Sequence, residues 1–445
     1  MAAKNEKLIV GLDVGSSKVC VIIGEVGRDN HIKIIGVGQS ASRGLSRGVV
    51  VNIEETTLAI ASAIEQAERQ ANLKIGSAFV GVAGAHISSI NSRGVVAVSR
   101  VDRDITHEDV GRAIESARSV AIPSQREVLH VIPRTFVIDG QDGVRDPVGM
   151  SGYRLEVETH IVTGGVSSLN NLFKAVQRVG IEVDELVLEP LAASEAVLSD
   201  AEKRLGVALV DIGAGTTDIA IYMDGTIWHT AVLPVGGSHF TNDIAIVLRT
   251  PPEVAERLKL KYGDASLVGP NKGYYADYYR PGGIGAKLNR TEPEQTEATE
   301  RPDEMIMVES FEGQPTQQVS RNMVNEIIHS RAKQLFEMVQ GEIKKSGYDG
   351  MIPAGLVFTG GTAGMTGLSD AAAHVLRMPV RVGVPRGLSG LSDSLGAPTY
   401  AASVGLVLWG LKKTLGDELL LESRRGGGGL TLGRKVGGWF RNFLP

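Results

Sequence analysis

The chain has 445 residues, of which 42% are hydrophobic and 22% charged, and its formal net charge is -5. This length predicts more than one lobe, because single cores stop growing at roughly 250 to 300 residues. The charge provides no global basic field, so nucleic acid is not an expected partner. The single cysteine, Cys20, excludes an intrachain disulfide and a cysteine-based zinc cluster, and we expect it to be buried.

The first predicted element is a strand, a glycine-containing turn and a second strand over residues 8–24, LIVGLDVGSSKVCVIIG. The residues before it lack the charged and apolar parts of a secretion signal. The turn follows Asp13 and contains Gly15, Ser16 and Ser17, with Lys18 directly after it. Glycine leaves backbone N–H groups open to an anion, because no side chain blocks the approach.

Residues 88–164 predict a small α+β module inserted in the first lobe. Strands are expected around 95–98 and 128–137, and the stretch DITHEDVGRAIESARSV predicts an amphipathic helix. Thr106 can cap this helix, with Asp109 three residues on. The alternative is that the module serves as a structural lid over the binding site.

A second turn of the same kind follows in the middle of the chain. Residues 186–198, LVLEPLAASEAVL, place Glu189 at the end of a strand and Pro190 in the first turn of a helix of small residues. Residues 207–223, VALVDIGAGTTDIAIYM, then repeat the N-terminal pattern. The repeated turn contains Asp211, Gly213, Gly215, Thr216 and Thr217.

Two copies of one pattern predict two related lobes whose turns face each other and clamp a polyphosphate. The serine and threonine hydroxyls and Lys18 would add donors and positive charge. Asp13 and Asp211 would repel phosphate unless a hard cation lay between them, and Mg²⁺ held largely through water is the expected ion. The alternative is a pair of purely structural hairpins.

Two later segments favour a binding site between the lobes. Residues 357–368, VFTGGTAGMTGL, predict a strand followed by a loop at Gly360 and Gly361 that can approach a flat ring or a phosphate. Residues 396–410, GAPTYAASVGLVLWG, predict a helix with alanine and glycine on one face, which permits a tight helix crossing and suits a hinge. The longest apolar run, residues 400–411, is shorter than the roughly 20 residues of a membrane span and predicts a buried helix.

The C-terminal end has a different character. Four glycines at 426–429 predict a flexible joint. Past them, apolar residues fall at helical spacing beside cations, a pattern typical of a helix in a membrane interface with anionic lipid. The predicted membrane contacts are Val436, Trp439, Phe440, Arg441, Phe443 and Leu444. A helix docked on the core, or a disordered tail, is the alternative.

This order of motifs resembles the actin, chaperone and sugar-kinase ATPase superfamily, and within it the FtsA family of bacterial cell-division proteins. The resemblance covers residues 7–265 and 318–411 and the C-terminal end, and the stretches 81–98, 128–164 and 250–265 are particularly specific. It implies an α/β, actin-like two-lobed ATPase fold with duplicated ribonuclease-H-like cores, the inserted α+β subdomain and a C-terminal amphipathic helix. The implied cofactors are ATP and Mg²⁺.

The resemblance also implies roles for single residues. The turn residues named above correspond to the family's two phosphate loops. Glu256 and Lys259 match its contacts to adenosine, and Gly360, Gly361 and Met365 match its purine and sugar loop. Glu189 lies where relatives place the residue that orients the attacking water.

Partners follow from the resemblance as well. Residues 266–317 depart from the family pattern and predict a variable, exposed loop in the subdomain that receives the C-terminal tail of the GTPase FtsZ. Arg321 and Arg331 remain at matching positions, where either could pair with an acidic peptide or form an ordinary surface salt bridge. The inserted subdomain would contact other division proteins and neighbouring subunits.

The sequence therefore predicts a peripheral protein on the cytoplasmic face of the membrane at the division septum. It would polymerise into actin-like filaments, tether FtsZ and hydrolyse ATP slowly at most. A sugar-kinase-type phosphotransferase and a pilus-assembly adaptor are the alternatives. The predicted divisions are 1–87 and 165–205 for the first lobe, 88–164 for the insertion, 206–385 for the second lobe, 386–415 for the returning helix, 416–429 for the linker and 430–445 for the membrane helix.

Overall fold

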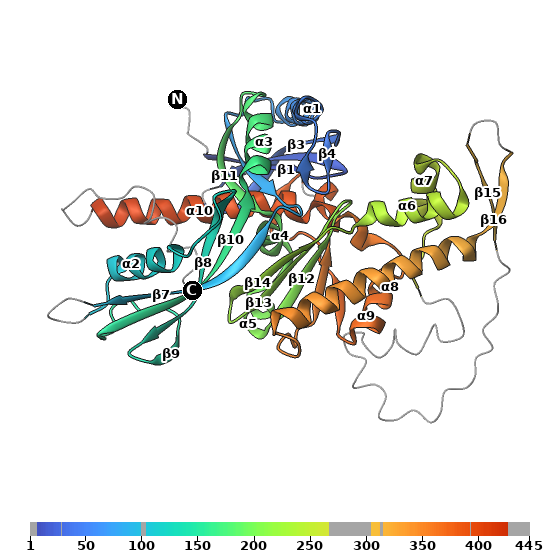
Figure 1. The fold of residues 1–445 in the computed structure, drawn as a ribbon. Helices are drawn as coiled ribbons and strands as arrows, with labels where there is room; N and C mark the ends of the chain where they lie inside the picture. Colours follow the sequence, from blue (N-terminus) through green and yellow to red (C-terminus); the bar gives the residue numbers. More distant parts are fainter. Residues whose placement is uncertain are drawn as a thin grey trace.

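The computed structural model describes residues 7–27, 29–98, 104–266, 304–311, 315–391 and 393–425. Two α/β lobes lie beside each other, and a smaller module with its own sheet extends from the first lobe (Figure 1). The α/β, two-lobed architecture with an inserted α+β module is therefore as predicted.

Six strands form the sheet of the first lobe, in the order β11-β6-β1-β2-β3-β19. β1, β2 and β3 are antiparallel, whereas β6 runs parallel to β1 and β11 parallel to β6. Residues 19–23 of β2 are all buried, which explains their unbroken apolar sequence. The bounds are β1 Lys7–Val14, β2 Lys18–Val26, β3 Ile32–Ala41, β6 Ser77–Val82, β11 Glu182–Leu188 and β19 Leu388–Gly390.

Helix α1 (Ile53–Ala71) covers this sheet on β3. Asn52 caps it, because its side chain accepts hydrogen bonds from the backbone N–H groups of Glu54 and Glu55. The helix approaches β3 so closely that a Cβ on Gly38 would lie 1.9 Å from the Ala63 carbonyl oxygen. Only glycine fits at that position. Shorter elements complete this lobe: β4 Leu45–Ser46, β5 Val49–Val50 and α3 Val166–Gln177.

The second lobe repeats the plan of the first. Its sheet has the order β14-β13-β12-β17-β18, with β12, β13 and β14 antiparallel and β17 parallel to β12. A hairpin, a third antiparallel strand and a parallel neighbour thus occur in both lobes, which confirms the predicted duplication. The strands are β12 Val207–Ile212, β13 Thr217–Met223, β14 Thr226–Leu233, β17 Leu356–Thr359 and β18 Val380–Val382.

In the described part of the chain, five helices pack around the second sheet and complete the second lobe. They are α5 Asp200–Leu205, α6 Gly237–Leu248, α7 Pro252–Tyr262, α8 Arg321–Ser346 and α9 Leu368–Leu376. A two-stranded sheet of β15 (Met305–Val308) and β16 (Gln317–Ser320) leads into α8. The end of the segment 266–317 therefore forms paired strands where a loop was predicted, while residues 267–303 lie outside the described residues.

The inserted module is a four-stranded antiparallel sheet, β7-β10-β8-β9, covered by α2. The predicted capping box is confirmed, because the side chains of Thr106 and Asp109 reciprocally bond the first turn of α2. The module also reaches the second lobe, where Ser89 Oγ donates to the Thr230 carbonyl at 3.0 Å and His160 Nε2 lies 2.9 Å from Thr230 Oγ1. The bounds are β7 Ser88–Ala97, α2 His107–Arg118, β8 Arg126–Ile138, β9 Gln141–Val144 and β10 Arg154–Gly165.

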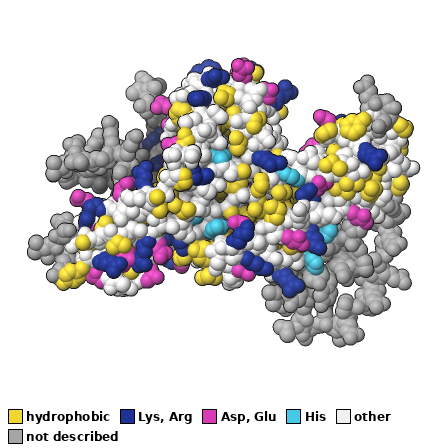
Figure 2. All heavy atoms as spheres, in the orientation of Figure 1, with side chains coloured by type: hydrophobic (Ala, Val, Ile, Leu, Met, Phe, Trp, Pro, Cys, Tyr) yellow, Lys and Arg dark blue, Asp and Glu magenta, His cyan; other side chains and the backbone are white. Residues whose placement is uncertain are grey.

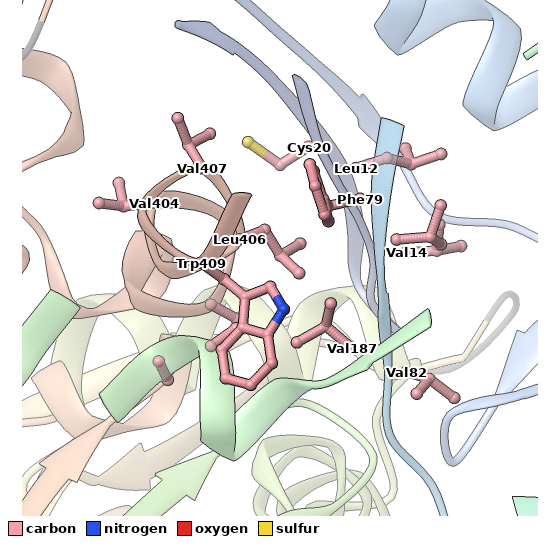
Figure 3. Packing of buried hydrophobic residues seen from close by; sticks show 14 of the residues in the cluster. Leu12, Val14, Cys20, Phe79, Val82, Val187, Val404, Leu406, Val407 and Trp409 are labelled. Atoms are coloured by element: carbon pink, nitrogen blue, oxygen red, sulfur yellow. The ribbon is translucent and has the colours of Figure 1, made fainter. Parts of the chain in front are cut away.

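Two helices cross tightly under the first sheet, α4 (Glu189–Val197) and α10 (Ala401–Arg425). A Cβ on Gly405 would lie 1.9 Å from the Ala192 carbonyl oxygen, so the predicted close crossing of small residues is confirmed. Leu406 and Val407 of α10 point toward the sheet that carries Cys20, which is buried as expected (Figure 3). Trp409 points away from that sheet and packs against His130 of β8. Helix α10 continues through 416–425, so the predicted linker at 416–429 is wrong for those residues.

Three short 3₁₀ turns remain. They are η1 Gly361–Gly364, η2 Asp393–Leu395 and η3 Pro398–Tyr400. The first follows β17 directly, and the last leads into α10. Residues of both turns line the cavity described next.

Candidate functional site

A cavity of about 1010 Å³ lies between the two lobes, and both predicted phosphate turns line it. No described residue of the inserted module borders this cavity, so the lid alternative for the module is not supported. All but one of the predicted nucleotide-site residues meet there. Those that line it are Asp13, Gly15, Ser16, Ser17, Lys18, Glu189, Asp211, Gly213, Gly215, Thr216, Glu256, Lys259, Gly360, Gly361 and Met365.

The first turn joins β1 to β2. Its N–H at Gly15 donates to the Lys18 carbonyl at 3.0 Å, which closes the turn. Ser16 Oγ accepts a hydrogen bond from the Gly48 N–H at 2.9 Å, so the hydroxyl is held at the edge of the cavity. The Lys18 ammonium lies 3.7 Å from the ring centre of Tyr400, which is the last residue of η3. Burial lowers the pKa of Lys18, and the carboxylates of Asp13 and Asp211 act against this shift.

The second turn joins β12 to β13 and closes in the same way, with the Gly213 N–H donating to the Thr216 carbonyl at 3.0 Å. The two turns touch at Gly215, where a Cβ would lie 2.9 Å from Ser16 Oγ and 2.9 Å from the Arg47 Cα. A side chain at Gly215 would therefore force the turns apart. The clamp geometry depends on this close approach.

Thr217 is the predicted residue that the structure does not bring to the cavity. Its side chain is fully buried and donates to the Val235 carbonyl at 2.8 Å. Thr216 does line the cavity and donates to Asp218 Oδ2 at 3.0 Å. Neighbouring residues of a strand point to opposite faces, so only one of the two threonines can face the ligand.

Four carboxyl groups converge on the cavity, where Asp13, Asp211 and Glu189 were predicted and Asp218 was not. Burial, followed by the charges of Asp218 and Asp13, raises the pKa of Asp211 to about 8. Burial likewise raises the pKa of Asp218 to about 7, against a hydrogen bond from Thr216. Burial and the other three carboxyl groups raise the pKa of Glu189 well above its usual value.

Asp218 is a functional candidate that sequence reasoning missed. It is 3% exposed, and its Oδ1 has no hydrogen-bond partner among the described residues. The register of the hairpin pairs Asp218 directly with Asp211, and paired residues share one face of a sheet. In the first hairpin the same position opposite Asp13 is Cys20.

Asp13 is held by α10 rather than by a neighbouring carboxyl. Ser403 Oγ donates to Asp13 Oδ2 at 2.6 Å. Burial raises the pKa of Asp13, and Lys18 and then Ser403 act against this shift. The first turn is thereby tied to the helix that crosses under the lobe.

The carboxyl groups of the cavity are suitable ligands for Mg²⁺, since hard cations prefer oxygen ligands such as carboxylates and water. Among the residues that the structure describes, no group of three or more histidine, cysteine or acidic side chains is arranged to hold a metal ion directly. A cation here would therefore take most of its ligands from water and phosphate. Coordination of Mg²⁺ by Asp13 and Asp211, largely through water, stays a prediction.

The cavity is also lined by the residues predicted to meet the base and sugar. Lys259 Nζ lies 2.7 Å from Glu256, 2.9 Å from Thr241 Oγ1 and 3.2 Å from the Gly237 carbonyl oxygen, so this cation is fixed between α6 and α7. Gly360, at a φ of 87°, passes close to the second turn, because a Cβ there would lie 2.3 Å from Asp211 Oδ1.

The other predicted site residues lie away from the cavity. Arg331 forms a two-pronged ion pair with Asp243, at 2.5 and 2.7 Å, and Arg321 Nη1 lies 3.0 Å from Glu304. Both arginines therefore make the salt bridges considered as their alternative. The predicted membrane residues between 436 and 444 lie outside the described residues. Among described residues, no helix is both long and apolar enough to span a membrane.

Comparison with known proteins gives the family. A model described as "SHS2 domain inserted in FTSA" matches residues 84–163, and one described as "Cell division protein FtsA" matches 208–405. Cell division protein FtsA of Pseudomonas aeruginosa is 44% identical over 93% of this chain and 91% of its own. The same protein of Escherichia coli K12 is 36% identical over 99% of this chain and 97% of its own.

Solved structures support the actin-like fold at low sequence identity. A PilM-PilN type IV pilus biogenesis complex matches with a TM-score of 0.61 and 14% identity, over 91% of this chain and 98% of that one. MreB5 of Spiroplasma citri, bound to ADP, matches with a TM-score of 0.50 and 14% identity, over 95% of this chain and 99% of that one. The chain therefore belongs to the FtsA family of cell-division proteins and has an actin-like fold.

Proposed function

We propose that this protein binds ATP with Mg²⁺ between its lobes and assembles into actin-like filaments that tether FtsZ to the cytoplasmic face of the membrane at the septum. Nucleotide binding is supported mainly by the close approach of the two predicted phosphate turns, which touch at Gly215 and Ser16 beside the cavity. Two glycine-containing turns on either side of one cavity suit a polyphosphate. ADP in the similar MreB5 structure agrees with this proposal.

The proposed binding mode uses residues of this chain in three places. The two turns would hold the phosphates, with Lys18 and a water-bound cation offsetting their charge. Glu256 and Lys259 would contact the adenosine, opposite the loop at Gly360. Glu189 would orient a water, provided that a cation first favours its ionised form, because the neighbouring carboxyl groups favour its neutral form.

Titration calorimetry of the full chain with MgATP tests the cavity. Gly215→Val pushes the turns apart, and Thr216→Val removes a donor without adding volume. We expect Gly215→Val to weaken binding at least about 10-fold, since a lost charge-assisted hydrogen bond is worth about 1.5 kcal/mol or more. Gly111→Ala, where a Cβ meets nothing within 4 Å, is the matched control. Equal affinity in wild type, Gly215→Val and Thr216→Val contradicts the nucleotide proposal.

Membrane attachment is proposed through the segment after the glycines at 426–429. Several attached subunits would bind more firmly than one, because linked sites raise effective concentration. Flotation with vesicles containing anionic lipid compares the full chain with one that ends at Arg425. We expect only the full chain to float, and equal flotation of both would exclude this tether.

FtsZ tethering is proposed for the subdomain of β15, β16 and α8. Its outer surface exposes Met305, Met307 and Met323 beside Arg321, which offers an apolar and cationic surface to an acidic peptide. Arg331 is the weaker candidate, since it would have to leave Asp243. A pull-down with the FtsZ tail peptide should weaken in Arg321→Glu and not in Arg118→Glu, whose arginine lies on α2. Retention of the peptide by Arg321→Glu would remove Arg321 from the proposal.

The same pull-down separates this function from the pilus-adaptor alternative, for which no FtsZ binding is expected. Recruitment of other division proteins by the inserted module also belongs to the proposal. Its support is the family match over residues 84–163. The sugar-kinase alternative has no counterpart among the relatives named above.

A further inference from the structure

A second cavity of about 640 Å³ lies where three parts of the molecule meet. The inserted module contributes β8, β9 and the adjoining Arg145, the second lobe contributes the β13–β14 hairpin, and α4, α5 and α10 form the rest of the wall. None of its lining residues also lines the nucleotide cavity. It is therefore separate from the site of the proposed function.

The charge of this cavity differs in sign from that of the chain. Six cationic side chains and four carboxylates line it. Lys413 is paired at 2.9 Å with a fifth carboxylate, Glu185, so an excess of one positive charge remains, whereas the whole chain carries -5. Lys203 and Lys412 share the single carboxylate of Glu195. These two lysines hold the pKa of Glu195 below its usual value against burial. The wall thus has cations that its own carboxylates do not balance.

Arg134 is the central unbalanced cation. Its guanidinium lies 3.9 Å from the Trp228 ring, and Nη2 donates to the Tyr348 hydroxyl at 2.9 Å. Its Nε is buried without a hydrogen-bond acceptor among the described residues. The stacking fixes the plane of the guanidinium, so that a ligand oxygen would meet a preset donor. Arg204, whose side chain also lines the cavity, is exposed on α5.

The rest of the wall is apolar and aromatic. Tyr222 and Trp409 are 4% and 7% exposed, and Ile227 lies in the same wall as Trp228. Pockets for small molecules commonly have about 300 to 1,000 Å³ and combine apolar walls with a few polar groups. This cavity has the size and the mixed lining of such a pocket.

We propose that this junction cavity binds a small organic anion with a flat apolar body. Its carboxylate, sulfonate or phosphate group would meet Arg134 and Arg204, and its body would lie against the aromatic wall. Because the wall combines the module and both lobes, the ligand would hold these three parts together. No residue of the nucleotide cavity takes part.

The test uses the dye 1-anilino-8-naphthalenesulfonate, which has the proposed chemistry, with the full chain. We expect saturable binding of one equivalent, seen as dye fluorescence, and displacement by 2-naphthalenesulfonate. Arg204→Gln and Arg134→Gln should each weaken it at least about 10-fold, the effect of one lost charge-assisted hydrogen bond. Arg118→Gln, an exposed arginine on α2, should leave it unchanged and is the matched control.

Three results would overturn the proposal. The first is wild-type dye affinity in both Arg134→Gln and Arg204→Gln. The second is displacement by uncharged N-phenyl-1-naphthylamine but not by 2-naphthalenesulfonate, which would show an apolar site without anion selectivity. The third is loss of dye on saturation with MgATP together with insensitivity to both substitutions, which would place the dye between the lobes. Arg204 is exposed, so Arg204→Gln keeps the test informative even where Arg134→Gln fails to fold.

Discussion

The cluster of carboxyl groups predicts that the nucleotide-free protein loses stability as pH rises, and that Asp211→Asn removes much of this loss. Asp211 has a folded pKa of about 8 against 3.8 for an ordinary aspartate. Because its pKa is raised on folding, the folded state holds the proton more tightly than the unfolded state. The resulting stability is fully present below the unfolded pKa and is lost as pH rises through about 8.

The magnitude follows from the size of the pKa shift. Each pH unit in this window changes the free energy of unfolding by about 1.4 kcal/mol, so about 3 kcal/mol is lost between about pH 5.5 and the folded pKa. This value is an upper limit, since Asp218 and Asp13 relax when Asp211 ionises. Asparagine has nearly the shape of the protonated carboxyl and does not titrate.

Differential scanning calorimetry without nucleotide or divalent cation measures the effect. The melting midpoint of Asp211→Asn should exceed that of wild type by more at about pH 8.5 than at about pH 5.5. Asp349→Asn, at an exposed position away from the cavity, is the control and should show no such pH dependence. A gap between variant and wild type that is the same at both pH values, or larger at the lower one, would refute the argument from buried carboxyl groups.

Three further predictions concern single contacts. Gly405→Ala should destabilise the protein by about 3 kcal/mol, because its Cβ would collide with α4. The control Gly341→Ala, in α8, should stabilise the protein by about 1 kcal/mol. Equal melting midpoints of the two variants would contradict the tight crossing. Thr217→Val should cost about 1 kcal/mol by calorimetry and leave MgATP affinity unchanged, since this hydroxyl faces the core; a lost affinity would return Thr217 to the phosphate site. Ser403→Ala should lower the melting midpoint more at high than at low pH, because its hydrogen bond favours ionised Asp13; an equal effect at both pH values would count against that bond.

The strand-turn-strand repeat could be predicted from sequence because apolar runs, Asp-x-Gly turns and their order are local signals. Asp13 and Asp211 occupy equivalent turns and do meet at one cavity. The assignment of Thr217 failed for a reason that the sequence itself contains. Thr217 begins β13, and the alternation of a strand directs it to the core and Asp218 to the cavity.

Other features could not be read from the chain because they depend on distant segments. The junction cavity combines residues around 134, 204, 228 and 409, whose proximity is decided by the packing of the inserted module against both lobes. The pairing of Arg331 with Asp243 joins α8 to α6, and no local pattern distinguishes it from a free arginine. The returning helix was predicted to end at residue 415, whereas α10 continues to Arg425.

Helix α10 has a mechanical consequence that goes beyond packing. Ser403, near its start, is bonded to the first phosphate turn through Asp13, and the helix continues without interruption to Arg425. At 1.5 Å per residue, the axis between these two positions is about 33 Å long. A tilt of only about 5° at Ser403 would therefore shift the far end by about 3 Å, more than the length of the Ser403–Asp13 hydrogen bond. A small rotation beside the first turn would thus be amplified at Arg425, the last described residue of the helix.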